Sequence, residues 1–319
     1  MPEMISIGEC LIELFSKEPI QKASTFNRSL GGDSFNILVA ASRLGTKTGY
    51  ITNFGDDPFE SYLRETITSE NIDVSNINVV KGFNSIAFIA VKSDGDREFV
   101  YYRKGSAATK IEPEDLNETL IANAKIMHCS GIGQAISTST KATILRAAQI
   151  AKKNNILVSY DPNYRHQLWS HNDAKKGMQE LMPYVDIFMP SLPADSEPLF
   201  DSDDPTEVIT KSHEMGVQIV VLTMGEMGAI VSQGNQQYEI SPYIYGDVVD
   251  TTGAGDSFKG GFIHGFLSNK SIEESALIGN VSAGITITGR GATSAMPYRK
   301  QVYEIIEKLN ANSIKKSRK

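Results

Sequence analysis

The chain has 319 residues and a formal net charge of −7, with 40% hydrophobic and 22% charged residues. These proportions are typical of a soluble globular protein, and the length suits one large domain or two smaller ones. The acidic balance argues against nucleic acid as the main partner, because a phosphate backbone binds a basic surface. We expect a cytoplasmic protein without a membrane partner, because only two cysteines occur and neither a signal peptide nor a membrane-length apolar stretch is visible.

The first predicted elements are a short strand and a helix. Residues 4–7 form a short apolar run. Ser34 can cap a helix whose apolar residues keep helical spacing as far as Leu44, and Gly45 is expected to end it.

Residues 85–103 predict a β-hairpin. Two alternating stretches, Ile86–Val91 and 98–103, are separated by Asp94-Gly95-Asp96, and Asp-Gly is a typical hairpin turn. Residues 9–30 also lack a convincing helical pattern.

From residue 126 onward the chain alternates between strand-like and helix-like segments. This alternation predicts a mostly parallel sheet covered by helices on both faces, in which ligands bind at the carboxyl ends of the strands. The apolar runs cover residues 126–129, 156–160, 187–189 and 218–223, and the helical patterns cover 138–153, 173–182 and 204–215.

Residues 250–261 are the most informative part of the chain. Gly253 and Gly255 allow a sharp turn and a close approach to a ligand, and the apolar residues that follow have helical spacing. The loop therefore leads into a helix N-terminus, which attracts an anion such as phosphate. Asp256 would stand beside that anion, where the chemistry that fits is proton removal from a hydroxyl that attacks a phosphoryl group. The alternative is an ordinary glycine-rich loop in which Asp256 only caps the helix.

Two better-known glycine-rich patterns are excluded. No Gly-x4-Gly-Lys-Ser/Thr occurs anywhere in the chain, so the loop is not a P-loop. Phe258 stands where a dinucleotide-binding loop needs glycine.

Asp250-Thr-Thr-Gly-Ala-Gly-Asp256 resembles the C-terminal motif of ribokinase-like (pfkB-type) carbohydrate kinases. The resemblance spans nearly the whole chain, because further motifs follow in the expected order: Gly31-Gly32-Asp33-Ser-Phe-Asn36, Gly55-Asp56-Asp57 and Thr223-Met-Gly225-Glu-Met-Gly228. It implies a three-layer α/β/α fold with a mostly parallel central sheet. It also implies a single domain over residues 1–319, with a small β-sheet lid inserted from about 9–30 and 84–104.

The resemblance implies ATP and Mg²⁺ as cofactors, with Asp256 as the base. The backbone of Gly253, Ala254 and Gly255 would stabilise the transferring group. Asp250 and Thr252 are candidate ligands of a monovalent cation such as K⁺. The candidate nucleotide-binding residues are Ser191, Thr223, Gly225, Gly228, Gly253, Gly255, Asn280 and Ala283.

The chain departs from the family pattern after the strand near residue 188. Many members carry Asn-x-x-Glu there, which helps to organise magnesium through water. Ser191 and Ala194 occupy these places, and Asp195 or Glu197 could substitute after a local shift.

The candidate substrate residues point to an acidic sugar. Arg103 and Arg165 could hold a carboxylate, because an arginine forks around both oxygens; surface charge and a structural ion pair are the alternatives. Both segments resemble 2-keto-3-deoxygluconate kinases, which makes that acid the predicted substrate. The full set implied by the resemblance is Gly32, Asp33, Asn36, Tyr101, Arg103 and Arg165.

Several alternatives stay open at this level. A neutral-sugar kinase of the fructokinase or ribokinase type would have less need for two arginines, and 5-dehydro-2-deoxygluconate kinases are a further close resemblance. A sugar-sensing protein without catalysis would not need to keep Asp256. The resemblance also implies a homo-oligomer, either a dimer formed through the β lid or a larger assembly.

Overall fold

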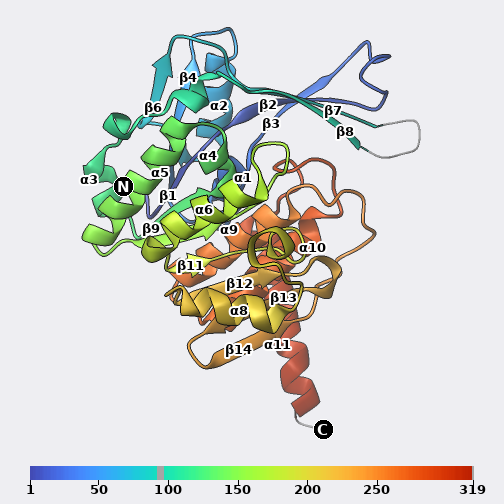
Figure 1. The fold of residues 1–319 in the computed structure, drawn as a ribbon. Helices are drawn as coiled ribbons and strands as arrows, with labels where there is room; N and C mark the ends of the chain where they lie inside the picture. The colour runs from blue at the N-terminus through green and yellow to red at the C-terminus, as the bar shows by residue number, and fades with distance from the viewer. Residues whose placement is uncertain (92–96, 318–319) are drawn as a thin grey trace.

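The computed structural model describes residues 1–91 and 97–317, and its largest element is a ten-stranded sheet (Figure 1). Neighbouring strands run parallel except at one edge, where β12, β13 and β14 are antiparallel. In sheet order the strands are β14 (Gln236–Ile240), β13 (Ala229–Gln233), β12 (Ile219–Thr223), β11 (Ile187–Phe188), β10 (Leu157–Asp161), β9 (Ile126–Ser130), β1 (Met4–Ile7), β4 (Thr48–Gly55) and β5 (Ile72–Asp73), and β6 (Ile77–Val80) pairs with β4. The predicted mostly parallel sheet is confirmed.

Helices cover both faces of this sheet and create two separate cores. Along β12, Ile219 and Val221 belong to one core and Val220 and Leu222 to the other, because successive side chains of a strand point to opposite faces. This explains why the central strands appear in the sequence as continuous apolar runs.

The first core is covered by α1 (Asp33–Leu44), α2 (Glu60–Ser69), α9 (Ala254–Leu267) and α10 (Ile272–Thr286). The second is covered by α3 (Glu118–Asn123), α5 (Thr138–Lys153), α6 (His171–Leu181), α7 (Ser196–Phe200) and α8 (Pro205–Glu214). The remaining helices are α4 (Gly131–Ala135) and α11 (Arg299–Ser317). No helix in the described part of the chain combines the length and apolar character that a bilayer span requires.

A second sheet extends away from the body, and it contains the segments predicted to form a lid (Figure 1). Its strand order is β3 (Asn27–Gly31), β2 (Leu11–Ser16), β7 (Ile86–Val91) and β8 (Arg97–Tyr102). The predicted strand pairing of residues 85–103 is confirmed by the antiparallel register of β7 and β8. The predicted turn Asp94-Gly95-Asp96 lies outside the described residues.

The start of α1 corrects one prediction. Ser34 is not the N-cap: the helix begins at Asp33, and Gly32 precedes it with a φ of 122°, a backbone conformation that favours glycine. The Ser34 hydroxyl instead donates to the Glu9 carbonyl at 3.2 Å. Gly45 ends the helix in the left-handed conformation, as predicted.

Helices α9 and α10 approach each other through glycine. A methyl group added at Gly279 would stand 2.4 Å from the Phe258 carbonyl oxygen, and one at Gly261 would stand 2.8 Å from the Gly279 Cα. Close contact of the two backbones therefore requires residues without a Cβ. This contact holds the helix that carries Asp256.

Replacing Gly279 by alanine is expected to lower the free energy of unfolding by about 1–3 kcal/mol, because the added methyl group forces α9 and α10 apart. Urea denaturation measures this change. Gly246→Ala is the control, because its methyl group would meet only Thr288 Cγ2 at an ordinary 3.5 Å. A Gly279→Ala protein as stable as the wild type would show that the two helices separate without cost.

Candidate active site

A cavity of about 1130 Å³ lies where the lid, the first turns of α1 and α9, and the loops after β10 and β11 meet. This is the carboxyl-end position expected for a ligand in a parallel sheet. The cavity gathers most of the predicted site residues: Gly32, Asp33, Asn36, Tyr101, Arg103, Arg165, Ser191, Thr252, Gly253, Gly255 and Asp256.

The anion-binding loop has the predicted geometry. Gly253 precedes α9 with a φ of 77°, and a methyl group there would stand 2.9 Å from the Ala292 Cα. Both the backbone conformation and the close contact therefore favour glycine. The first helical hydrogen bond runs from the Ser257 N–H to the Gly253 carbonyl at 2.8 Å. The N–H groups of Gly255 and Asp256 come before it, where a helix leaves its donors without helical acceptors. A methyl group on Gly255 would meet nothing within 4 Å, so there is room for a ligand at this turn.

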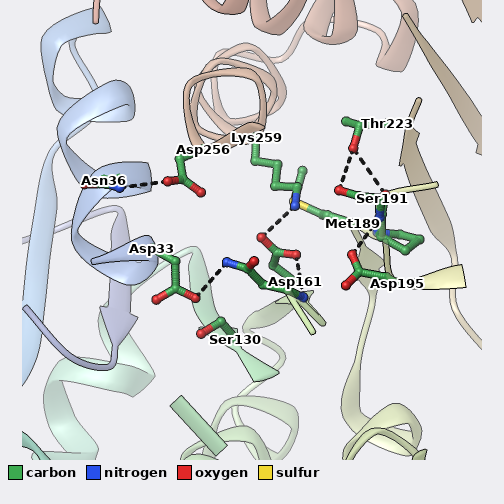
Figure 2. Close-up of polar contacts among 12 residues, drawn as sticks. Asp33, Asn36, Ser130, Asp161, Met189, Ser191, Asp195, Thr223, Asp256 and Lys259 are labelled. Atoms are coloured by element: carbon green, nitrogen blue, oxygen red, sulfur yellow. Dashed lines mark hydrogen bonds and ion pairs between the residues drawn. The ribbon is translucent and has the colours of Figure 1, made fainter. Parts of the chain in front are cut away.

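Asp256 lies in the first turn of α9, half-buried, with its carboxylate toward α1 (Figure 2). Asn36 donates a hydrogen bond to Asp256 Oδ2 at 2.8 Å. Burial raises the pKa of Asp256 to about 7, although the Asn36 hydrogen bond acts in the opposite direction. Asn36 therefore contacts the predicted base, and it also lines the cavity in which it is predicted to contact the substrate.

Asp33 begins α1 and lies on the same helix as Asn36 (Figure 2). Its carboxylate accepts hydrogen bonds from the Ser34 N–H at 2.8 Å and from Asn163 Nδ2 at 3.2 Å. Asn163 has a φ of 38°, in the left-handed region, and its own N–H donates to Asp161 Oδ1. The segment after β10 is thus connected to the start of α1.

The cavity also contains an ion pair that no pattern in the sequence predicted. Lys259 Nζ lies 2.6 Å from Asp161 Oδ2, and the two side chains are only 4% and 3% exposed (Figure 2). Two signals were available: Lys259 follows Asp256 by three residues in a predicted helix, and Asp161 directly follows a predicted strand. Neither signal reveals that α9 and β10 bring these residues into contact.

Asp195 occupies the turn after β11, near the place of the missing Asn-x-x-Glu. Its carboxylate accepts hydrogen bonds from the N–H groups of Ser191 and Tyr164 at 2.8 and 2.7 Å. Burial raises the pKa of Asp195 to about 6, and the nearby Asp161 adds to the effect. Glu197 is exposed and does not line the cavity. Of the two predicted substitutes, Asp195 alone is therefore part of the site.

The two arginines lie on the same cavity but in different environments. Arg103 forms an ion pair with the buried Glu9, while its Nε has no hydrogen-bond partner among the described residues. Burial raises the pKa of Glu9 despite this pairing. Arg165 is exposed, and its guanidinium donates to the Tyr164 carbonyl at 3.2 Å.

The Tyr101 hydroxyl is affected by the charges of both arginines. Burial raises the pKa of its hydroxyl, and both Arg103 and Arg165 oppose that rise. Two segments more than 60 residues apart in the chain thus line the same cavity.

The predicted nucleotide residues outside the loop form a less compact group. Thr223 does not itself line the cavity, but its hydroxyl lies 2.8 Å from the hydroxyl of Ser191, which does. The Asn280 amide is used within the chain, accepting from the Tyr243 N–H and donating to the Ser241 carbonyl. Gly225, Gly228 and Ala283 do not line the cavity.

The predicted monovalent-cation residues shape the loop. Asp250 accepts hydrogen bonds from the N–H groups of Thr252 and Gly291, both at 2.8 Å. It therefore connects the anion-binding loop to the segment that carries Ala292. No cluster of three or more metal-ligating side chains occurs within residues 1–91 and 97–317.

Comparison with known proteins agrees with this geometry. The profile of the pfkB family carbohydrate kinases matches residues 1–299. The chain belongs to this family. It is a phosphotransferase that acts on a sugar hydroxyl.

Relatives within the family carry different substrate names. Probable fructokinase-2 of Arabidopsis thaliana is 32% identical over 309 residues, covering 92% of each chain. The 2-dehydro-3-deoxygluconokinase of Thermoproteus tenax is 28% identical over 316 residues, covering 97% of this chain and 95% of its own. A putative ribokinase II from E. coli, solved in complex with ATP and Mg²⁺, has the same fold, with a TM-score of 0.89 at 24% identity over 97% of this chain and 100% of its own.

Asp256→Asn is expected to stabilise this pfkB-family protein above pH 7 and to leave its stability unchanged below about pH 4. The folded pKa of about 7 exceeds the unfolded value, so the wild type loses stability as the pH rises from about 4 to about 7. Urea denaturation at several pH values measures the difference. The exposed Asp203→Asn is the control, and equal stability of the wild type and Asp256→Asn at every pH would contradict the raised pKa.

Proposed function

We propose that the protein transfers the γ-phosphoryl group of ATP to the terminal hydroxyl of an acidic sugar, with 2-keto-3-deoxygluconate as the substrate and its 6-phosphate as the product. The observation that supports this best is that Arg103, Arg165 and Tyr101 line the same cavity as Asp256. The arginines would hold the carboxylate at one end and leave the terminal hydroxyl near the base.

Asp256 would act as the general base. Its carboxylate accepts a proton from the hydroxyl as that oxygen attacks the phosphorus, and the bond from phosphorus to the ADP oxygen breaks. The raised pKa keeps it a stronger base than an exposed aspartate. Asn36 holds one carboxylate oxygen and leaves the other for the substrate.

The loop at residues 253–255 fits the phosphates of ATP, because it combines N–H donors with open space at Gly255. Mg²⁺ fits as an ion carried by the nucleotide and its waters. The inner carboxylates are already engaged, Asp161 by Lys259 and Asp195 by backbone N–H groups. When bound, Mg²⁺ would neutralise phosphate charge.

A neutral ketohexose such as fructose is the second candidate. Two observations favour it: several relatives are named fructokinases, and Glu9 already pairs with Arg103. Two other observations favour an acidic sugar. The raised pKa of Glu9 weakens its pairing with Arg103, and the Nε of Arg103 has no hydrogen-bond partner among the described residues.

Two further features of this proposal concern assembly and ions. The lid presents exposed aromatic side chains, among them Phe99 and Tyr102, which would suit pairing of two lids in a dimer. Asp250 and Thr252 remain the candidate ligands for K⁺.

Replacing Asp256 by asparagine is expected to lower kcat by about 10²–10⁴, because the proton acceptor is lost. In the wild type, kcat/KM should rise as the pH passes through about 7, the pKa of Asp256. A coupled ADP-release assay over a range of pH measures both. Near-native turnover by Asp256→Asn would exclude the residue as the base.

Arg165→Ala should raise KM for 2-keto-3-deoxygluconate by at least about tenfold and leave KM for fructose within about twofold, because the lost bond to a charged group exists only with the acid. Both sugars, with ribose as a third, are tested at equal concentrations on the wild type and the variant. Arg146→Ala is the matched control, because Arg146 lies on α5 and pairs with Glu118 at the surface. Preference of the wild type for fructose, with no effect of Arg165→Ala, would replace the acid by a neutral sugar.

A further inference from the structure

Lys259 is a buried cation on the part of α9 that carries Asp256. The two residues are three positions apart in the helix, a spacing that places side chains side by side. Both line the cavity. In Figure 2 the Lys259 ammonium points into the space between Asp256 and the turn that holds Ser191.

The Lys259 ammonium is affected by the negative charges of more than one carboxylate. Burial by itself would lower the pKa of Lys259, but Asp161 and Asp195 outweigh burial and raise it. The side chain is therefore charged at neutral pH. An ammonium has three N–H donors, and Asp161 is its partner among the described residues.

The other cations of the cavity lie elsewhere. Among the described residues that line it, Arg103 and Lys104 belong to the lid segment and Arg165 follows β10. Lys259 is the cation on the helix whose first turn forms the anion-binding loop. A fixed positive charge at that place can act on a phosphoryl group without reorganisation.

We propose that Lys259 is a catalytic residue that donates a hydrogen bond to a nonbridging oxygen of the phosphoryl group in transit, while Asp161 holds the ammonium in position. This rests on the proposed delivery of the γ-phosphoryl group at the N-terminus of α9. Lys259 stays protonated throughout: the hydroxyl proton goes to Asp256, the new bond joins the sugar oxygen to phosphorus, and ADP leaves with its electron pair. The charge would stabilise the oxygens on which negative charge gathers.

The test compares Lys259→Met, Asp161→Asn and the double variant. Methionine is an unbranched side chain one atom shorter than lysine, and it removes the charge. The double variant leaves no unpaired carboxylate at position 161, so its fold is protected. Lys270→Met is the control, because Lys270 is exposed after α9 and lies 3.6 Å from Glu274. Measured are kcat across the pH range and the affinities for ATP and ADP by calorimetry.

If Lys259 contacts the phosphoryl group, both variants that lack it lose kcat by about 10²–10³ at every pH. Their affinity for ATP falls at least about tenfold relative to ADP, which has no γ-phosphate. Three results would overturn the proposal. In the first, kcat of the double variant recovers to within about threefold of that of Asp161→Asn. In the second, the ratio of ATP to ADP affinity is unchanged. In the third, the pH profile of kcat shifts while its plateau is unchanged. The first would make Lys259 a counter-ion of Asp161, and the last would mean that it acts through Asp256.

The nucleotide measurements need no sugar, so they separate this proposal from the choice of substrate. If none of the tested sugars is phosphorylated, the substrate proposal fails. A selective loss of ATP affinity in Lys259→Met would still support the contact.

Discussion

The balance of charge inside one cavity is the constraint on which the site depends. Carboxylates that share a buried space cannot all ionise without cost. The fold meets this cost with a separate donor for each: Asn163 for Asp33, Asn36 for Asp256, backbone N–H groups for Asp195 and Lys259 for Asp161. What remains uncompensated appears as the raised pKa values of Asp195 and Asp256.

This arrangement costs stability, and the packing elsewhere offsets the cost. Two cores, one on each face of the sheet, bury the alternating side chains of the central strands. Contact between α9 and α10 without intervening side chains positions the first turn of α9. Asp256 can be kept in an unfavourable environment because the helix that carries it is held along its length.

Selectivity for the sugar is a separate matter from the phosphoryl chemistry. Asp256 and its loop belong to the body, whereas Tyr101 and Arg103 come with the lid. Relatives named for fructose and for 2-dehydro-3-deoxygluconate both align over more than nine-tenths of this chain. The same family thus includes relatives named for different sugars, and in this chain the cavity is lined by residues of the lid and of the loop after β10. The pairing of Arg103 with Glu9 shows how a single buried carboxylate can weaken a clamp for an acid.

Local patterns determined much of this protein in advance. The alternation of apolar runs and helical stretches predicts the parallel sheet, and the glycines before α9 predict the anion-binding loop, because both depend on neighbours in the chain. The N-cap of α1 was mispredicted even so, since a serine at a helix start does not show whether a preceding glycine already adopts the cap conformation.

Contacts between distant segments were decided only by the tertiary structure. Asn36 meets Asp256 across 220 positions of sequence, and Lys259 meets Asp161 between a helix and a strand. Arg103 was expected to face a substrate but also faces Glu9, from the start of the chain. The sequence by itself thus determined which residues stand at the ends of strands and the starts of helices. Only the tertiary structure decided which charged side chains share a cavity. Such pairs depend on how helices and strands pack against each other, and they produce no periodic pattern in the sequence.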